Sequence, residues 1–275
     1  MRLMRSLDYF YDEYLDIEAA SEAFLSQSLH PRGPQMLFDV VEKLGLPAGV
    51  FVLDVGCGEG ASSLELARRF RFNLLGLDPI PRHMAIATEA LKNASAQDAS
   101  LRKFVHFALG QAEAIPTRDN CVDFIWCRDV LVHVEHLDQA FSEFRRVLNK
   151  KGKILILHSF ATDLLESREA EWLWSTMRVV PSNTNLQYFE QTLSDSNLQI
   201  ETCTDLKSEW KEFAEEQTGK NSKKLLYAAR LQRDPAFYIS KFGKEAYDIM
   251  LGDCFWHIYQ MIGKLSYRVY LLRAE

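Results

Sequence analysis

The chain has 275 residues, of which 47% are hydrophobic and 25% charged, and its formal net charge at pH 7 is −6. These proportions are typical of a globular protein and argue against long disordered or fibrous segments. The negative net charge disfavours nucleic acid as a partner, because phosphates attract basic surfaces.

The sequence gives no sign of a membrane segment, a leader or a metal site. Charged residues interrupt every apolar run before it reaches the roughly 18 residues of a spanning helix. The first eight residues turn acidic and aromatic where a signal peptide would be apolar. The five cysteines include no C-x-x-C pair, which favours reduced thiols over zinc ligands or disulfides. We expect a cytoplasmic protein without bound metal that contacts neither nucleic acid nor membrane.

Residues 1–49 are expected to form an N-terminal helical lid, with helices at about 9–28 and 34–44 separated by a Pro- and Gly-containing breaker. Strand and helix patterns then alternate, which predicts a parallel sheet covered by helices. The expected strands cover residues 51–55, 73–77, 105–108, 122–127 and 153–158. The expected helices between them cover residues 61–70, 82–94 and 137–148.

Beyond residue 158 the alternation loosens. The pattern predicts helices at about 166–177 and 186–196, a strand at 199–205, a long helical stretch from 209 to 262, and a strand at 265–272. We therefore expect a sheet domain at 50–206, a helical insertion at 207–263 that forms a substrate lid, and a closing edge strand at 264–275.

The most informative segment is the glycine-rich sequence of residues 54–60, which follows the first strand and precedes a helix. Glycines allow tight turns and close approach to a ligand, and the helix start offers free N–H groups. Gly56, Gly58 and Ala61 also match the G-x-G-x-x-A dinucleotide pattern. The carboxylates of Asp54 and Glu59 would repel a pyrophosphate but attract a sulfonium and an ammonium. The segment therefore favours S-adenosylmethionine, with S-adenosylhomocysteine as product, over a nicotinamide dinucleotide.

Asp78 lies at the end of the second strand pattern, 24 residues after Asp54. A carboxylate at this position can accept hydrogen bonds from both ribose hydroxyls. It also precedes a predicted helix and would serve as its N-cap. Both roles are compatible, and the position beside the glycine loop favours the ribose.

Five segments carry a resemblance to a known family: residues 54–60, 77–78, 110–116, 124–127 and 144–152. In this order they resemble the class I S-adenosylmethionine-dependent methyltransferases over about residues 50–158. Within that family the chain is most similar to the sarcosine/dimethylglycine N-methyltransferases and sugar O-methyltransferases.

The resemblance implies an α/β fold with a Rossmann-like, doubly wound seven-stranded sheet, an antiparallel last strand, and helical insertions that form a lid. It places Gln111, Ala112 and Glu113 around the adenine, although the family usually has Asp where Gln111 stands; the Gln carbonyl can still accept a hydrogen bond. Cys127, through its backbone, and Arg128 would lie by the methionine moiety. Together with the loop and strand-end residues, the predicted cofactor-binding set is Asp54, Gly56, Cys57, Gly58, Gly60, Asp78, Pro79, Gln111, Ala112, Glu113, Cys127 and Arg128.

The segment of residues 128–133 follows the fourth strand, where open parallel sheets bind their ligands. His133 is the first candidate for a general base, with a purely structural loop histidine as the equal alternative. Asp129 would orient His133, neutralise an acceptor amine, or cap a helix. His158, at the end of the fifth strand, is a weaker second candidate for the base.

These features predict an S-adenosylmethionine-dependent methyltransferase that acts on a small-molecule acceptor by in-line transfer to oxygen or nitrogen. A nicotinamide-dependent oxidoreductase on a Rossmann fold and a non-catalytic cofactor-binding protein remain alternatives. The sequence leaves open the acceptor, the atom methylated, the need for a base, and whether the protein is a monomer or a homodimer.

Overall fold

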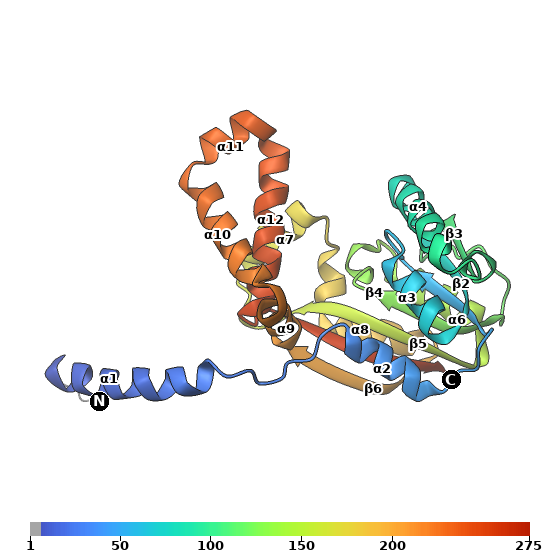
Figure 1. Ribbon diagram of the computed structural model, residues 1–275, viewed down its shortest axis with the longest axis horizontal. Coiled ribbons are helices and arrows are strands. Elements are labelled where there is room, and N and C mark those ends of the chain that lie inside the picture. Colours follow the sequence, from blue (N-terminus) through green and yellow to red (C-terminus); the bar gives the residue numbers. More distant parts are fainter. Residues whose placement is uncertain (1–6) are drawn as a thin grey trace.

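The computed structural model describes residues 7–275 and is built around one seven-stranded sheet (Figure 1). The strands lie in the order β3-β2-β1-β4-β5-β7-β6; β1 to β5 are mutually parallel, and β7 runs antiparallel to β5 and β6. Their bounds are β1 Phe51–Val55, β2 Asn73–Asp78, β3 Val105–Leu109, β4 Val122–Arg128, β5 Leu148–Ala161, β6 Leu198–Lys207 and β7 Leu265–Ala274. This arrangement confirms the predicted doubly wound sheet with an antiparallel last strand.

The last strand is not at the edge of the sheet, which corrects one part of the predicted domain organisation. β7 pairs with β5 on one side and β6 on the other, so β6 forms the edge. The reason lies in the side chains: most residues of β7 are buried, whereas the middle of β6 is largely exposed. A strand with apolar residues on both faces is stabilised by an inner position, because both faces are then covered.

Helices cover both faces of the sheet. On one face α6 and α8 contribute the aromatic core residues Phe141, Phe144 and Phe189, and on the other face α2 and α3 contribute residues such as Leu37 and Leu66. In α6 the buried residues recur every three or four positions, as expected for a helix with one apolar face. The bounds are α2 Gln35–Leu44, α3 Ala61–Phe70, α4 Pro81–Gln97, α5 Leu101–Phe104, α6 Leu137–Val147 and α8 Leu186–Asp195.

The predicted N-terminal lid divides into two different parts. α2 packs on the sheet through Leu37, Phe38 and Val41 and therefore belongs to the core. α1 (Leu7–Leu25) has no buried residue and projects away from the rest of the molecule (Figure 1). Residues 1–6 of the predicted lid lie outside the described residues. A covering role for α1 remains a prediction.

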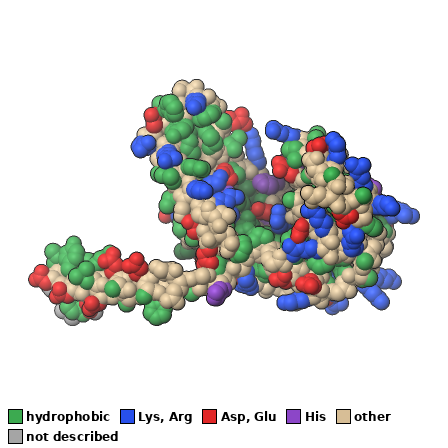
Figure 2. All heavy atoms as spheres, in the orientation of Figure 1, with side chains coloured by type: hydrophobic (Ala, Val, Ile, Leu, Met, Phe, Trp, Pro, Cys, Tyr) green, Lys and Arg blue, Asp and Glu red, His purple; other side chains and the backbone are tan. Residues whose placement is uncertain are grey.

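The helical insertion between β6 and β7 forms a lobe that rises beside the sheet domain (Figure 1). Figure 2 shows a hollow between this lobe and the sheet domain, with hydrophobic side chains at its base. The lobe is held by aromatic pairs with α7, including Trp174 with Trp256 and Trp172 with Phe255, whose ring centroids are 6.0 and 5.6 Å apart. These rings therefore serve helix packing. The bounds are α7 Ser167–Met177, α9 Glu209–Thr218, α10 Lys220–Arg233, α11 Pro235–Phe242 and α12 Lys244–Met261.

Two short 3₁₀ helices complete the fold: η1 (Leu131–His133) follows β4, and η2 (Pro181–Thr184) follows α7. Within residues 7–275, no helix is both long enough and apolar enough to cross a membrane.

Candidate active site

A cleft of about 780 Å³ lies at the carboxyl ends of β1, β2, β3 and β4. Its volume is within the usual range for small-molecule sites, and its position is the one at which open α/β sheets bind ligands. It is lined by Val55, Gly56, Gly58, Asp78, Pro79, Ile80, His83, Gly110, Gln111, Ala112, Glu113, Arg128, Asp129, Val130, His133, Val134, Glu135, His136 and Gln139. Eight of the twelve predicted cofactor-binding residues and both predicted catalytic residues are in this set.

The glycine loop brings bare backbone to the cleft wall. Gly56 and Gly58 have φ angles of +70° and +53°, which non-glycine residues rarely adopt. A Cβ at Gly56 would lie 2.1 Å from Cγ2 of Val130, so any side chain there would clash. The loop is tied to β2, because the N–H groups of Gly56 and Cys57 both donate to the carbonyl oxygen of Leu77. Its backbone is therefore fixed before any ligand binds.

Asp78 joins the glycine loop to the start of α4. Its Oδ2 accepts from the N–H of Gly58 at 3.0 Å, and its Oδ1 accepts from the N–H of Ile80 at 2.9 Å and from Nδ1 of His83 at 3.0 Å. The N-cap of α4 is Ile80, so the predicted capping role of Asp78 is wrong in detail: its side chain accepts from the N–H of Ile80 two residues later and forms a turn just before the helix. A carboxylate oxygen has two acceptor sites, so Oδ2 retains capacity for a ligand hydroxyl.

Four predicted cofactor-binding residues do not line the cleft. Asp54 is 2% exposed beneath the loop, where its Oδ2 accepts from Oγ of Ser63 at 2.5 Å. Burial raises the pKa of Asp54 to about 6, although Ser63 opposes this rise. The other three face inward: Cys57 packs with Met84 and Ala87, Gly60 faces Phe107, and Cys127 lies in the sheet core.

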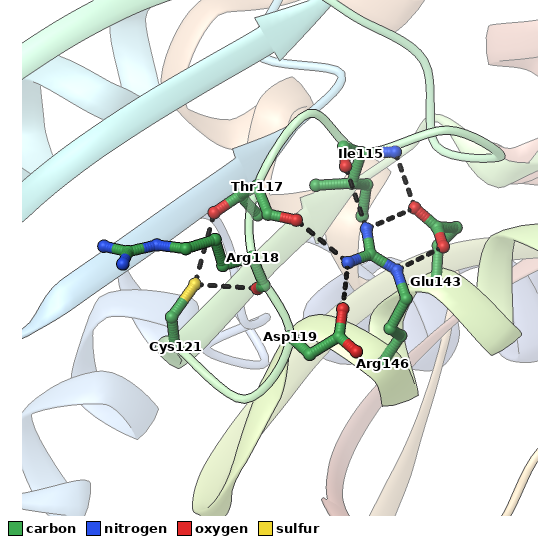
Figure 3. Close-up of polar contacts among 7 residues, drawn as sticks. All are labelled: Ile115, Thr117, Arg118, Asp119, Cys121, Glu143 and Arg146. Atoms are coloured by element: carbon green, nitrogen blue, oxygen red, sulfur yellow. Dashed lines mark hydrogen bonds and ion pairs between the residues drawn. The ribbon is translucent and has the colours of Figure 1, made fainter.

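The wall formed by Gln111, Ala112 and Glu113 belongs to the loop between β3 and β4, which Arg146 of α6 holds in place (Figure 3). The Arg146 guanidinium donates to the carbonyl oxygens of Ile115 and Thr117 at 2.9 Å and to the carboxylates of Asp119 and Glu143. Glu143 in turn accepts from the N–H of Ile115 at 2.8 Å. These bonds join backbone groups of the loop to side chains of α6, so α6 fixes one side of the cleft.

Asp129 borders the cleft. One prediction was that it orients His133, but its side chain bonds to a different residue. Its φ of +61° places the residue in the left-handed region, and its Oδ2 accepts from Oη of Tyr267 at 2.9 Å. Tyr267 is in β7, so this contact joins the end of β4 to the start of β7.

The two candidate bases have different surroundings. His133 lines the cleft, and its Nδ1 lies 3.0 Å from the carbonyl oxygen of Arg178. Because a carbonyl only accepts, Nδ1 carries a proton, and in the neutral imidazole the lone pair is then on Nε2. His158 is fully buried, stacks on Phe189 and donates from Nε2 to the carbonyl oxygen of Asn183, and burial lowers its pKa to about 4. His158 is therefore a core residue.

Sequence reasoning missed other residues of the cleft. His83 follows Asp78 by five residues, and Pro81 at the start of the helix signals that His83 lies in its first turn. His136 and Gln139 lie at the start of α6, and no local motif marks them. Within residues 7–275, no group of three or more His, Cys, Asp or Glu side chains is arranged to hold a metal ion.

Comparison with known proteins shows similarity to methyltransferases. Residues 53–156 match the family model described as a methyltransferase domain. The methyltransferase GfsG of Streptomyces halstedii is 31% identical over 45% of this chain and 43% of that protein. Phosphoethanolamine N-methyltransferase 1 of Arabidopsis thaliana is 27% identical over 78% of this chain and 40% of that protein. The chain thus spans about two fifths of the length of these curated relatives.

The fold is also that of solved structures. A putative sarcosine dimethylglycine methyltransferase from Galdieria sulphuraria superposes with a TM-score of 0.65 at 19% identity, covering 87% of this chain and 83% of that one. Residues 53–156 of the chain are therefore similar to a methyltransferase domain.

Proposed function

We propose that this protein is an S-adenosylmethionine-dependent methyltransferase that acts on a small-molecule acceptor. The observation that carries the proposal is a single cleft that combines the glycine loop, Asp78 and the loop of residues 111–113 with Asp129 and His133. A cofactor site and a candidate proton acceptor thus border the same space.

The residues divide between holding the cofactor and positioning the acceptor. Gly56 and Gly58 offer backbone at the cleft wall, Asp78 would accept from the ribose, and residues 111–113 would enclose the adenine. The cofactor supplies an activated methyl group, so the protein mainly aligns the acceptor and excludes water. His133 would remove a proton from a hydroxyl or ammonium acceptor through Nε2, because Nδ1 is engaged with Arg178. Asp129 would attract a positively charged acceptor.

The nature of the acceptor follows from similarity and not from the cleft alone. The name of the Arabidopsis relative indicates an amine that carries a phosphate. Transfer to nitrogen is therefore our first expectation, and transfer to oxygen the second. We further infer that the protein acts in the cytoplasm, as a monomer or homodimer, without nucleic acid or membrane partners.

The test has two stages. Calorimetry should show micromolar binding of S-adenosylmethionine or S-adenosylhomocysteine and no binding of a nicotinamide dinucleotide. Release of S-adenosylhomocysteine should then be measured against a library of amines and alcohols that includes phosphoethanolamine. Dinucleotide binding without S-adenosylhomocysteine binding would favour the oxidoreductase alternative, and cofactor binding without turnover of any acceptor would favour the non-catalytic one.

A further inference from the structure

Lys211, in the first turn of α9, is a lysine whose side chain is buried, which is unusual for a charged residue. The residue is 7% exposed, yet no hydrogen bond or ion pair to its Nζ is found among the described residues. The ring of Tyr267 lies beside this ammonium, with its centroid 5.9 Å from Nζ. A buried ammonium without a partner is costly, which makes this group a candidate for pairing with an anionic ligand.

The groups around Lys211 leave its charge unneutralised. The charged residues whose fields act on it are Asp129, Lys220, Asp253 and Lys224. Asp129 already accepts from Tyr267, and Asp253 pairs with Lys224. Counting Lys211 itself, three ammonium groups face two carboxylates.

His257, on α12, also faces this region but adds no charge. Its Nδ1 donates to the carbonyl oxygen of Asp253 at 2.9 Å, and burial lowers the pKa of the imidazole to about 4. Lys211 also lowers that pKa. The region therefore carries one more positive charge than negative charges.

The location of this site relative to the cleft suggests what it binds. The cofactor residues lie at the ends of β1, β2 and β3, in one half of the sheet. Lys211 follows β6 in the other half, and Tyr267 is near the start of β7. Asp129 lies between the halves, since it borders the cleft and also accepts from Tyr267. Tyr267 donates to Asp129 and lies next to the Lys211 ammonium, so an acceptor that extends from the cofactor past Asp129 would approach Lys211.

We propose that Lys211 forms a binding subsite for an anionic group, carboxylate or phosphate, on the methyl acceptor. The proposal rests on the proposed function, because it assigns one end of the acceptor of that reaction. The reacting atom lies near Asp129 and His133, and the anionic group binds the Lys211 ammonium. Lys211 thus determines which acceptors bind and takes no part in proton transfer.

The first experiment uses anions alone as probes. Inorganic phosphate and acetate are titrated separately into the protein saturated with S-adenosylhomocysteine, and binding is followed by calorimetry. We expect at least one anion to bind wild type and to bind Lys211→Met about tenfold or more weakly. Lys211→Arg, which keeps the charge, should retain most of the binding. Lys223→Met is the matched control, because Lys223 is an exposed lysine on the neighbouring α10.

The outcomes separate this proposal from the proposed function. If neither anion binds, or if Lys211→Met binds them as wild type does, the subsite is wrong even though S-adenosylhomocysteine binds. If wild type fails to bind S-adenosylhomocysteine, the proposed function fails first. Methionine has nearly the shape of lysine without its charge, and unchanged S-adenosylhomocysteine affinity of the variant shows that it is folded.

A second experiment uses the acceptor once one is found. For an acceptor with an anionic group, Lys211→Met should raise KM at least tenfold with little change in kcat, and the pH profile of kcat should not move. For an uncharged analogue the variant should behave as wild type. A fall in kcat with loss of the acidic limb of the profile, where a general base is protonated and inactive, would make Lys211 a proton acceptor and would overturn the proposal.

Discussion

Asp78→Asn is the most informative single substitution, because Asp78 combines a structural and a proposed ligand-binding role. The carboxylate accepts from the N–H groups of Gly58 and Ile80 and from Nδ1 of His83. Asparagine keeps the shape but replaces one acceptor oxygen by an NH₂ group that faces a donor. Hydrogen bonds to charged groups contribute about 1.5–3 kcal/mol each. We expect the free energy of unfolding to fall by about that amount.

The effect on the cofactor should be similar in size and separable from the effect on folding. A lost contact with the ribose should weaken S-adenosylhomocysteine by about 1–3 kcal/mol, or roughly 5- to 150-fold in Kd. Calorimetry should compare S-adenosylhomocysteine with its 2′,3′-dideoxy analogue in both proteins. If Asp78 contacts the hydroxyls, wild type prefers S-adenosylhomocysteine strongly and Asp78→Asn prefers it much less. His83→Asn is the control that leaves the carboxylate in place.

Two results would refute this reasoning. Equal weakening of both ligands by Asp78→Asn would show that Asp78 only holds the glycine loop. Unchanged binding in a folded variant would show that the carboxylate contributes nothing to the cofactor site.

Three further predictions concern the surroundings of the cleft. Arg146→Met should lower the free energy of unfolding, measured in urea, by about 1–3 kcal/mol, because it removes the hydrogen bonds that hold the loop after β3. It should also weaken S-adenosylhomocysteine binding. The control Arg145→Met should change neither quantity. Burial lowers the pKa of His158 to about 4, below its ordinary 6.5, so between these pH values the unfolded chain binds more protons than the folded chain. The free energy of unfolding should therefore fall by about 3 kcal/mol as the pH drops from 6.5 to 4. His158→Gln should flatten that part of the stability curve, and a curve like that of wild type would contradict the assignment. Finally, amide exchange in α1 and in residues 209–262 should slow when S-adenosylhomocysteine binds; protection confined to the glycine loop would show that neither segment is a lid.

The sequence by itself determined the features that depend on local chemistry. Strand and helix alternation follows from the spacing of apolar residues, and the parallel sheet follows from that alternation. The turn at Gly56 and Gly58 requires positive φ angles that glycine adopts most easily, so its place could be read directly. Asp78 could also be identified from the sequence, because it ends the second strand and the carboxyl end of that strand lies beside the glycine loop.

Only the tertiary structure decided the features that depend on contacts between distant residues. The inner position of β7 results from pairing with β5 and β6, which no local pattern specifies. His133 is oriented by the carbonyl of Arg178, 45 residues away, and not by nearby Asp129. Cys57 and Cys127 lie in the predicted segments but face the core, because packing and not spacing sets the direction of a side chain. Lys211 became a candidate only when folding buried its charge beside Tyr267, with no hydrogen-bond or ion-pair partner within residues 7–275, since burial and pairing are properties of the whole fold.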